Sequence, residues 1–207
     1  MADPGVRGSL PADADGDTMA IPVIRPGTRP PGEEDRHVTI GVAVAVPEPY
    51  GSELERWRAD FGDPQAAVIP AHVTLLPPTP VEREALPRIR EHLHRAASTH
   101  EPFPMVLRGT GSFRPVSDVV FVQVAEGIAE CEQLEREVRG GPLHRDLAFY
   151  YHPHVTVAHD LPHANLDRAS TTLADYEARF TVSSFTAYLH DGDGVWRVDH
   201  EFGLGTA

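Results

Sequence analysis

Apolar residues alternate with small ones in the first regular stretch of the chain, VTIGVAVAV at residues 38–46. Five β-branched residues share one face, and the other face carries only Thr, Gly and Ala. A period of two residues predicts a β-strand, because successive side chains of a strand point to opposite faces. The small side chains of the second face predict that another part of the molecule packs closely against it.

Further along the chain, apolar residues recur every three or four positions, which is the spacing of one helix face. This pattern predicts helices at 52–61, 85–97, 128–138 and 166–180. Shorter apolar runs between them predict strands, at 72–76, 103–113, 118–125, 154–159, 180–190 and 195–202.

The order strand, helix, strand, helix, strand therefore occurs twice in succession. We expect a mixed α/β (α+β) fold in which the duplicated units form two similar lobes, related by approximate two-fold symmetry. The segment before this pattern, residues 1–36, is rich in Pro, Gly and Asp. Such a segment buries too little apolar surface to offset its chain entropy, so we expect a disordered tail at 1–36 and one folded domain at 37–207.

Charge and composition exclude several classes of protein. The net charge of −13 argues against a grip on long duplex nucleic acid, which usually needs a basic face. No apolar run of about 18 residues is present, so no membrane span is expected. Cys131 is the only cysteine, which fits a reducing cytoplasm, and a monomer is expected. All 18 basic residues are arginine, which excludes chemistry through a lysine nucleophile.

The triplet His-Val-Thr occurs three times, at 37–39, 72–74 and 154–156. The second and third copies lie 82 residues apart, in strands that are equivalent in the two units. The first copy opens a strand whose equivalent has no such triplet, so we interpret it as a coincidence. His37 is then an ordinary residue at the entry of a strand.

Within a strand, the first and third residues of the triplet share a face. His72 with Thr74, and His154 with Thr156, would thus project into one groove between the lobes. Two facing histidines suit the chemistry of phosphate esters, because a neutral imidazole accepts a proton from the attacking oxygen and an imidazolium protonates the leaving oxygen. The threonine hydroxyls can donate hydrogen bonds to phosphate oxygens as their charge grows. This arrangement requires no metal and no cofactor.

The segments IPAHVTLLPPT and YHPHVTVAH make residues 37–205 resemble the 2H phosphoesterase superfamily, and most of all its bacterial 2′-5′ RNA ligase-like (LigT-like) branch. The resemblance implies a bilobed fold with antiparallel sheets around a central cleft. It also implies an enzyme that opens 2′,3′-cyclic phosphates on RNA ends or small nucleotides, in some members with ATP-independent joining in reverse. The catalytic set carried over is His72, Thr74, His154 and Thr156.

Four further residues are weaker candidates for substrate binding. Arg114 could hold a phosphate, Phe113 and Tyr151 could stack on a base, and His152 could line the groove. For each of them, a purely structural role is an equal or better explanation. The expected partner is a small nucleotide or a short RNA end.

Two other functions remain open from the sequence. The segment HPHVTVAHDLPH holds four histidines and one aspartate, which would suit a metal-dependent hydrolase. In a regular strand, however, His159 would lie on the face opposite His154, and no HExxH motif is present. The other alternative is a non-catalytic module that binds nucleotides, against which the retention of both histidines and both threonines argues.

Overall fold

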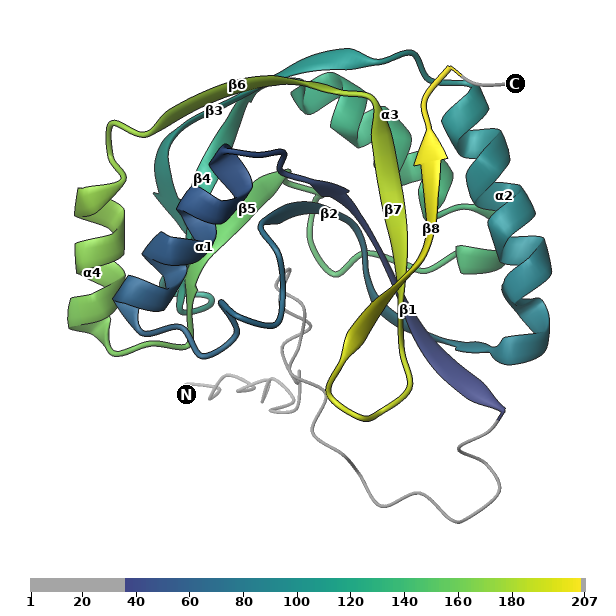
Figure 1. Cartoon of the computed structure of the whole chain (residues 1–207), viewed down its shortest axis with the longest axis horizontal. Coiled ribbons are helices and arrows are strands. Elements are labelled where there is room, and N and C mark those ends of the chain that lie inside the picture. Colours follow the sequence, from purple (N-terminus) through teal and green to yellow (C-terminus); the bar gives the residue numbers. More distant parts are fainter. Residues whose placement is uncertain (1–35, 206–207) are drawn as a thin grey trace, which may run out of the picture.

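The computed structural model describes residues 36–205, and the expected tail at 1–36 lies outside that range apart from its last residue. Figure 1 shows a curved sheet with helices gathered at its two ends. The helices are α1 (Tyr50–Phe61), α2 (Leu86–Ser98), α3 (Ile128–Val138) and α4 (His163–Thr172), with short 3-10 turns at Arg83–Ala85 and Gly141–Leu143. None of the helices described combines the length and apolar character that a membrane crossing requires.

Eight strands form one antiparallel sheet. They are β1 (His37–Ala45), β2 (His72–Glu82), β3 (Phe103–Ser112), β4 (Val119–Glu126), β5 (His154–His159), β6 (Glu177–Val182), β7 (Ser184–His190) and β8 (Trp196–Gly203). Their order across the sheet is β6-β3-β4-β5-β2-β1-β7-β8. The expected α/β class with antiparallel strands is confirmed.

The sheet consists of two four-stranded halves that touch at its centre. Strands β2 and β5 meet through a single residue pair, Val73 with Val155, whereas the other neighbouring strands pair over five or more residues. Both central strands begin at a histidine of the repeated triplet. The two motifs therefore lie next to each other where the halves join.

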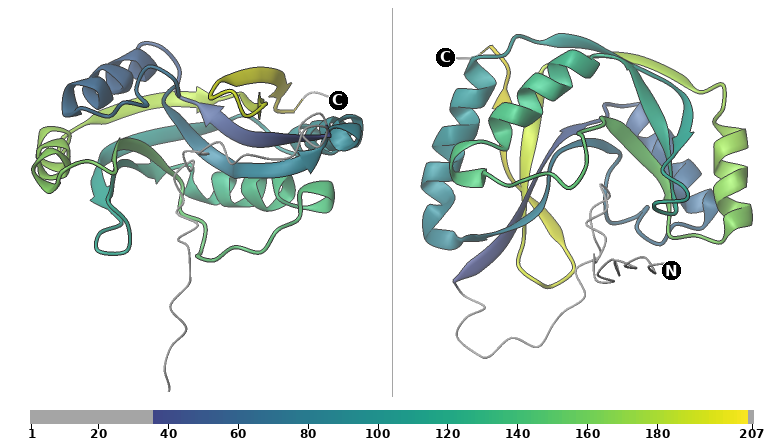
Figure 2. Two further views of the ribbon diagram at one scale, coloured as in Figure 1. Left: turned by 90° about the horizontal axis from the view of Figure 1, so that it is seen from below. Right: turned by 180° about the vertical axis from the view of Figure 1, so that it is seen from behind.

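Each half draws on both duplicated units, which the sequence did not predict. Strand β3 closes the first unit but pairs with β4 and β6, while β7 from the end of the chain pairs with β1. The helices cross over in the same way: α1 contacts β5 and α4, and α3 contacts β2 and α2. Figure 2 shows the same pairs of helices at opposite ends of the sheet. The exchange makes the halves interdependent.

The apolar face predicted for β1 is buried as expected. Val38, Ile40, Val42 and Val44 are at most 3% exposed. Ile40, Val42 and Val44 join a continuous core that also holds the inward faces of α1, α2 and α3, through residues such as Leu54, Leu93 and Leu134. Burial of this size is the main stabilising contribution to the fold. It also makes the two central strands rigid supports for the side chains on their other face.

Two predicted elements are wrong. The helix expected at 166–180 ends at Thr172, and Glu177–Val182 forms β6 instead. Ala178 and Val182 of this segment are buried, and the segment pairs with β3 as the edge strand of the sheet. This pairing overrides a weak helical pattern. The single strand expected at 180–190 is also wrong, because β6 and β7 are separated at Ser183 and lie at opposite ends of the strand order.

Candidate active site

The four residues of the two motifs line one pocket. Val73, Leu75, Val155 and Val157 are fully buried in the core, at 0–1% exposure. The alternation of the strands then places the side chains between them on the other face of the sheet. There the pocket is lined by His72, Thr74, His154, Thr156, Arg58, Gln65, Ile69 and His159.

The two histidines are held in the same way. Nδ1 of His72 lies 2.7 Å from the carbonyl oxygen of Pro70, and Nδ1 of His154 lies 2.7 Å from that of His152. A carbonyl oxygen can only accept, so each Nδ1 carries the proton and donates it. Nε2 is then the nitrogen left free for a substrate in each ring, unprotonated when the imidazole is neutral.

Burial keeps both rings uncharged near neutral pH. Loss of hydration lowers the pKa of His72 from 6.5 to about 4, and the positive charge of Arg58 acts in the same direction. Burial likewise lowers the pKa of His154 to about 4, with smaller contributions from His152 and His72. The hydrogen bonds to the carbonyl oxygens oppose these shifts only in part. An anionic ligand would reverse the effect, because a nearby negative charge favours the protonated imidazole.

Arg58 belongs to the pocket although its sequence context gave no sign of it. The residue is 5% exposed, and its guanidinium donates two hydrogen bonds to Asp63 at 2.9 and 3.1 Å and a third to the carbonyl of Ile69 at 2.9 Å. These bonds attach α1 to the loop that leads into His72. An arginine on a helix is usually a surface residue, so only the tertiary structure identifies this one.

His159 also lines the pocket, contrary to the sequence-based expectation that it faces away from His154. The expectation assumed a regular strand. In the pairing of β4 with β5, Val120 opposes Ala158 but Phe121 opposes Thr156, so Val157 is an extra residue. This β-bulge turns Ala158 into the core, at 0% exposure, and returns His159 to the face of His154 and Thr156.

Aromatic rings surround His154. Phe113 stands edge-on to the His154 ring at 5.0 Å between centroids, and Phe121 lies at the same distance. His152 lies 6.2 Å from His154 in a roughly parallel orientation. Two of the weaker candidates, Phe113 and His152, are therefore close neighbours of a motif histidine. Their part in substrate binding stays a prediction.

The other two weak candidates lie in different settings. Arg114 donates to Asp167 at 2.8 Å and to Ser112 at 3.2 Å, outside the pocket of the motif residues. Tyr151 donates its hydroxyl to the carbonyl of Thr74 at 2.9 Å and packs against the core. Tyr151 thus supports β2, and a stacking role for it or a phosphate role for Arg114 is untested.

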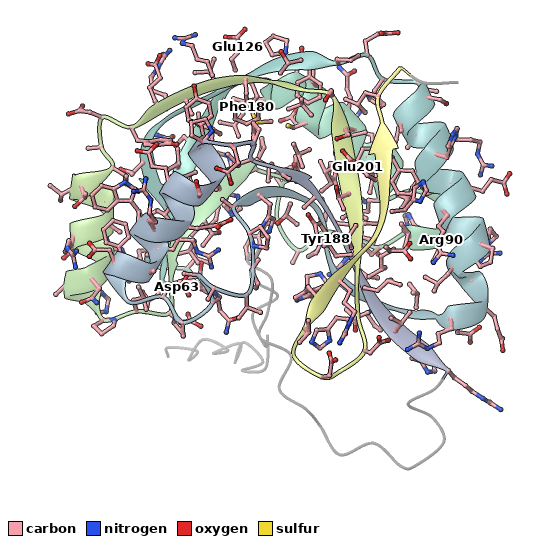
Figure 3. All side chains as sticks on the ribbon, viewed as in Figure 1. Asp63, Arg90, Glu126, Phe180, Tyr188 and Glu201 are labelled. Carbon is pink, nitrogen blue, oxygen red and sulfur yellow. The ribbon has the colours of Figure 1, made fainter. Side chains whose placement is uncertain are left out.

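A second, mostly apolar pocket adjoins His72 and Thr74. The small face of β1 forms its floor with Gly41 and Ala43, and Tyr188 of β7 and Trp196 of β8 form its walls. A Cβ atom at position 41 would lie 3.4 Å from the Trp196 ring, so the glycine allows this close approach. The packing expected against the small face of β1 is thereby explained. Figure 3 labels Tyr188 on this side and Asp63 near α1 on the other.

The remaining histidines do not assemble a metal centre. Within residues 36–205, no group of three or more His, Cys, Asp or Glu side chains has the proximity that an ion would need. His37 of the first triplet pairs with Glu82, at the far end of β2 from His72, and lines none of the pockets described above. The structure therefore separates the first His-Val-Thr copy from the other two.

The two His-x-Thr (HxT) motifs lie on the strands where the antiparallel half-sheets join, and both motifs face one pocket. This arrangement is that of the 2H phosphoesterase class. Residues 46–194 match the family described as the 2′-5′ RNA ligase superfamily, and the chain belongs to that family. It is 30% identical over 146 residues to a protein of Bacillus cereus (strain G9842) named "Putative phosphoesterase", covering 69% of this chain and 84% of that one. A protein of Bacillus thuringiensis (strain Al Hakam) with the same description matches equally well.

Solved structures show the same fold. E. coli LigT in its apo form aligns with a TM-score of 0.62 at 19% identity, covering 83% of this chain and 99% of LigT. TT0787 of Thermus thermophilus aligns with a TM-score of 0.51 at 23% identity, covering 81% and 98%. Family and fold together support an activity of the phosphoesterase type.

Proposed function

We propose that this protein is a metal-independent cyclic phosphodiesterase, which opens 2′,3′-cyclic phosphates on RNA ends or small nucleotides. The observation that carries the proposal is the matched pair of histidines. Both rings line one pocket, both donate Nδ1–H to a carbonyl, and both leave Nε2 free. A pair of this kind can remove a proton at one oxygen of a phosphate ester and deliver one at another.

In the proposed reaction, water attacks the phosphorus atom while one neutral imidazole takes a proton from it through Nε2. The bond between phosphorus and one ribose oxygen breaks, and the second histidine, as imidazolium, gives its Nε2 proton to that oxygen. The product is a phosphomonoester and a free hydroxyl, and the two histidines have exchanged protonation states. Thr74 and Thr156 donate their hydroxyl protons to the equatorial oxygens of the phosphate.

The low pKa values of the two histidines determine when the catalytic acid gains its proton in this scheme. Both imidazoles are neutral near pH 7 without a ligand, so the catalytic acid must gain its proton together with the anionic substrate. Substrate binding is therefore coupled to uptake of a proton. With a 5′-hydroxyl in place of water as the attacking group, the same scheme would break the bond from phosphorus to the 3′ oxygen and leave a 2′-5′ linkage without ATP, and we include this joining in the proposal.

Small nucleotides and short RNA ends are the proposed partners. Structures of E. coli LigT with 3′-AMP and with NADP+ share the fold of this chain, at 19% identity each. The pocket of the motif residues is flanked by apolar surface at Tyr188 and Trp196, which suits one base more than a long duplex. We expect a monomer that acts in the cytoplasm, where a single cysteine needs no oxidising compartment.

The proposal is tested by a screen of the four nucleoside 2′,3′-cyclic phosphates and of cyclic-phosphate-ended oligonucleotides in the presence of a chelator. We expect turnover to a monoester that persists in the chelator, with the position of the product phosphate read by chromatography. Turnover that is lost in the chelator and restored by a divalent metal would favour the metal-dependent alternative. Binding of the cyclic nucleotides without turnover would favour the non-catalytic alternative.

A further inference from the structure

A third histidine lies in the catalytic pocket, and the proposed mechanism does not use it. His159 follows Thr156 on β5 and lines the same pocket as the four motif residues. Its side chain is 17% exposed, so it is largely enclosed but still open to a ligand. Since the two motif histidines account for both proton transfers, this imidazole is available for another role.

Two irregularities of the backbone hold His159 there. The β-bulge at Val157 shifts the alternation of β5 by one residue, as the pairing with Val120 and Phe121 shows. Immediately after His159, Asp160 has φ 51°, the one non-glycine residue with positive φ among residues 36–205, and its N–H donates to the carbonyl of Asp118 at 3.0 Å. Such conformations are unfavourable for a residue with a Cβ and persist where the surrounding structure holds them.

The side chains beside His159 carry donors that the protein does not use. The guanidinium of Arg58 has five N–H groups, and its three hydrogen bonds to Asp63 and Ile69 leave one on each terminal nitrogen. This arginine is only 5% exposed, so those donors point into the protein or the pocket and not into bulk water. Gln65 also lines the pocket, and within the described part of the chain its backbone N–H and carbonyl make hydrogen bonds whereas its side-chain amide makes none. Unused donors of this kind call for an acceptor with several oxygens.

We propose that His159, together with Arg58 and Gln65, forms an oxyanion-binding subsite that holds the phosphate oxygens which Thr74 and Thr156 leave free. This role rests on the proposed function, and it concerns binding, not proton transfer. The anion and the Asp160 carboxylate, which lies 3.5 Å from Nε2 of His159, would both stabilise positive charge on this ring. Its largest benefit would come after ring opening, because a phosphomonoester carries more negative charge than the cyclic diester.

Charges of both signs face His159 and shape this effect. The cation is Arg58 on α1, whose charge is matched by the buried Asp63. The carboxylates are Asp160 next to His159 and Asp118, which precedes the residue paired with His159 on β4. His72 and His154 share the pocket and are neutral until an anion enters. A bound anion would thus add to the negative charge that the Asp160 carboxylate already places beside position 159.

The test measures binding of inorganic sulfate, a tetrahedral dianion whose charge does not change between about pH 5.5 and 8. Calorimetry would compare the full-length protein with H159Q, which keeps a polar side chain without charge, and with H159R, which is positive at both pH values. H163Q is the matched control, because His163 is exposed at the start of α4 and lies outside the pocket. Thermal unfolding of each variant checks that the fold is retained.

At pH 5.5 we expect H159Q to bind sulfate about tenfold more weakly than the wild type, as loss of a charge-assisted hydrogen bond implies. The difference should shrink to about twofold at pH 8, where an imidazole is largely neutral. H159R should bind at least as well as the wild type at pH 8, and H163Q should match the wild type throughout. The same order should appear in product inhibition and KM, with kcat changed less.

Equal sulfate affinity of H159Q and wild type at pH 5.5 would overturn the subsite, as would an H159R variant no better than H159Q at pH 8. The proposed function can fail separately. If the wild type turns over no cyclic phosphate but still binds sulfate in a manner that depends on His159, the catalytic proposal is wrong and the oxyanion subsite stands.

Discussion

The two HxT strands share a local geometry but have different surroundings. Each histidine opens its strand, donates Nδ1–H over 2.7 Å to the carbonyl two residues earlier, and has its pKa lowered to about 4. Around His72 lie Arg58 and the apolar pocket of Tyr188 and Trp196, whereas Phe113, Phe121 and His152 enclose His154. The repeated unit therefore accounts for the matched geometry of the two histidines, and their different neighbours would give the two rings distinct roles in the proposed reaction.

The largest expected effect tests the feature that the two strands share. His72→Ala and His154→Ala should each lower kcat on a 2′,3′-cyclic phosphate by about 10²–10⁴-fold, because each removes one proton transfer. The double variant should lose less than the product of the two factors, since both residues act on one transition state. Steady-state kinetics with the wild type and the three variants would check this. If either single variant keeps near wild-type kcat, the paired mechanism is wrong.

The next prediction separates the two histidines. The fixed positive charge of Arg58 disfavours an imidazolium at His72, so we expect His72 to be the base and His154 the acid in ring opening. A nucleoside p-nitrophenyl phosphodiester needs little help from an acid, because its leaving group is stable as an anion. On that substrate, the defect of His154→Ala should shrink by about tenfold or more, and that of His72→Ala should persist. The reverse pattern would exchange the assignments.

The threonines should show a smaller, symmetric effect. Thr74→Val and Thr156→Val each replace a hydroxyl by a methyl group of similar size and leave both histidines in place. Loss of one donor to a charged oxygen should lower kcat/KM by about 10- to 100-fold. A much larger loss for one of the two would show that the halves of the pocket do not contribute equally to charge stabilisation.

The pKa shifts predict how stability depends on pH. Both histidines have a pKa near 4 in the folded state and near 6.5 when unfolded, so between these values the unfolded chain binds more protons. The free energy of unfolding should therefore fall as pH drops from about 6.5 to about 4. The double variant H72Q/H154Q has neither histidine and does not lose this stability. Its Tm minus that of the wild type should therefore increase as the pH is lowered from about 6.5 to about 4. A constant Tm difference from about pH 7 to 4.5 would contradict the shifts.

The same comparison shows what the sequence could predict. The bounds of α3 and β5 agree with the predicted 128–138 and 154–159, because both segments have strong local periodicity. The shared face of each histidine and threonine also follows from the two-residue period of a strand. These features depend on residues that are neighbours in sequence, so local patterns are enough to find them.

The sequence did not predict the features that arise from contacts between segments far apart in the chain. The place of Arg58 in the pocket arises from the packing of α1 against the other half of the sheet and the return of the chain through Ile69. The orientation of His159 results from a bulge that is visible only once β4 pairs with β5. The exchange of β3 and β7 between halves has the same origin, since pairing partners about 70 or more residues apart leave no local signal.

The smallest expected effect concerns the first His-Val-Thr copy. His37 starts β1, pairs with Glu82 far from the pocket, and its ring Nδ1 has no hydrogen-bond partner among residues 36–205. Removing the ring takes away a buried polar atom without a partner there, so His37→Ala should leave kcat and KM within about twofold of wild type and change stability little. Kinetics beside His72→Ala would check this. A loss of activity in His37→Ala that matched His72→Ala would show that the triplet at 37–39 belongs with the other two, and the equivalence of β2 with β5 would no longer explain which copies carry the chemistry.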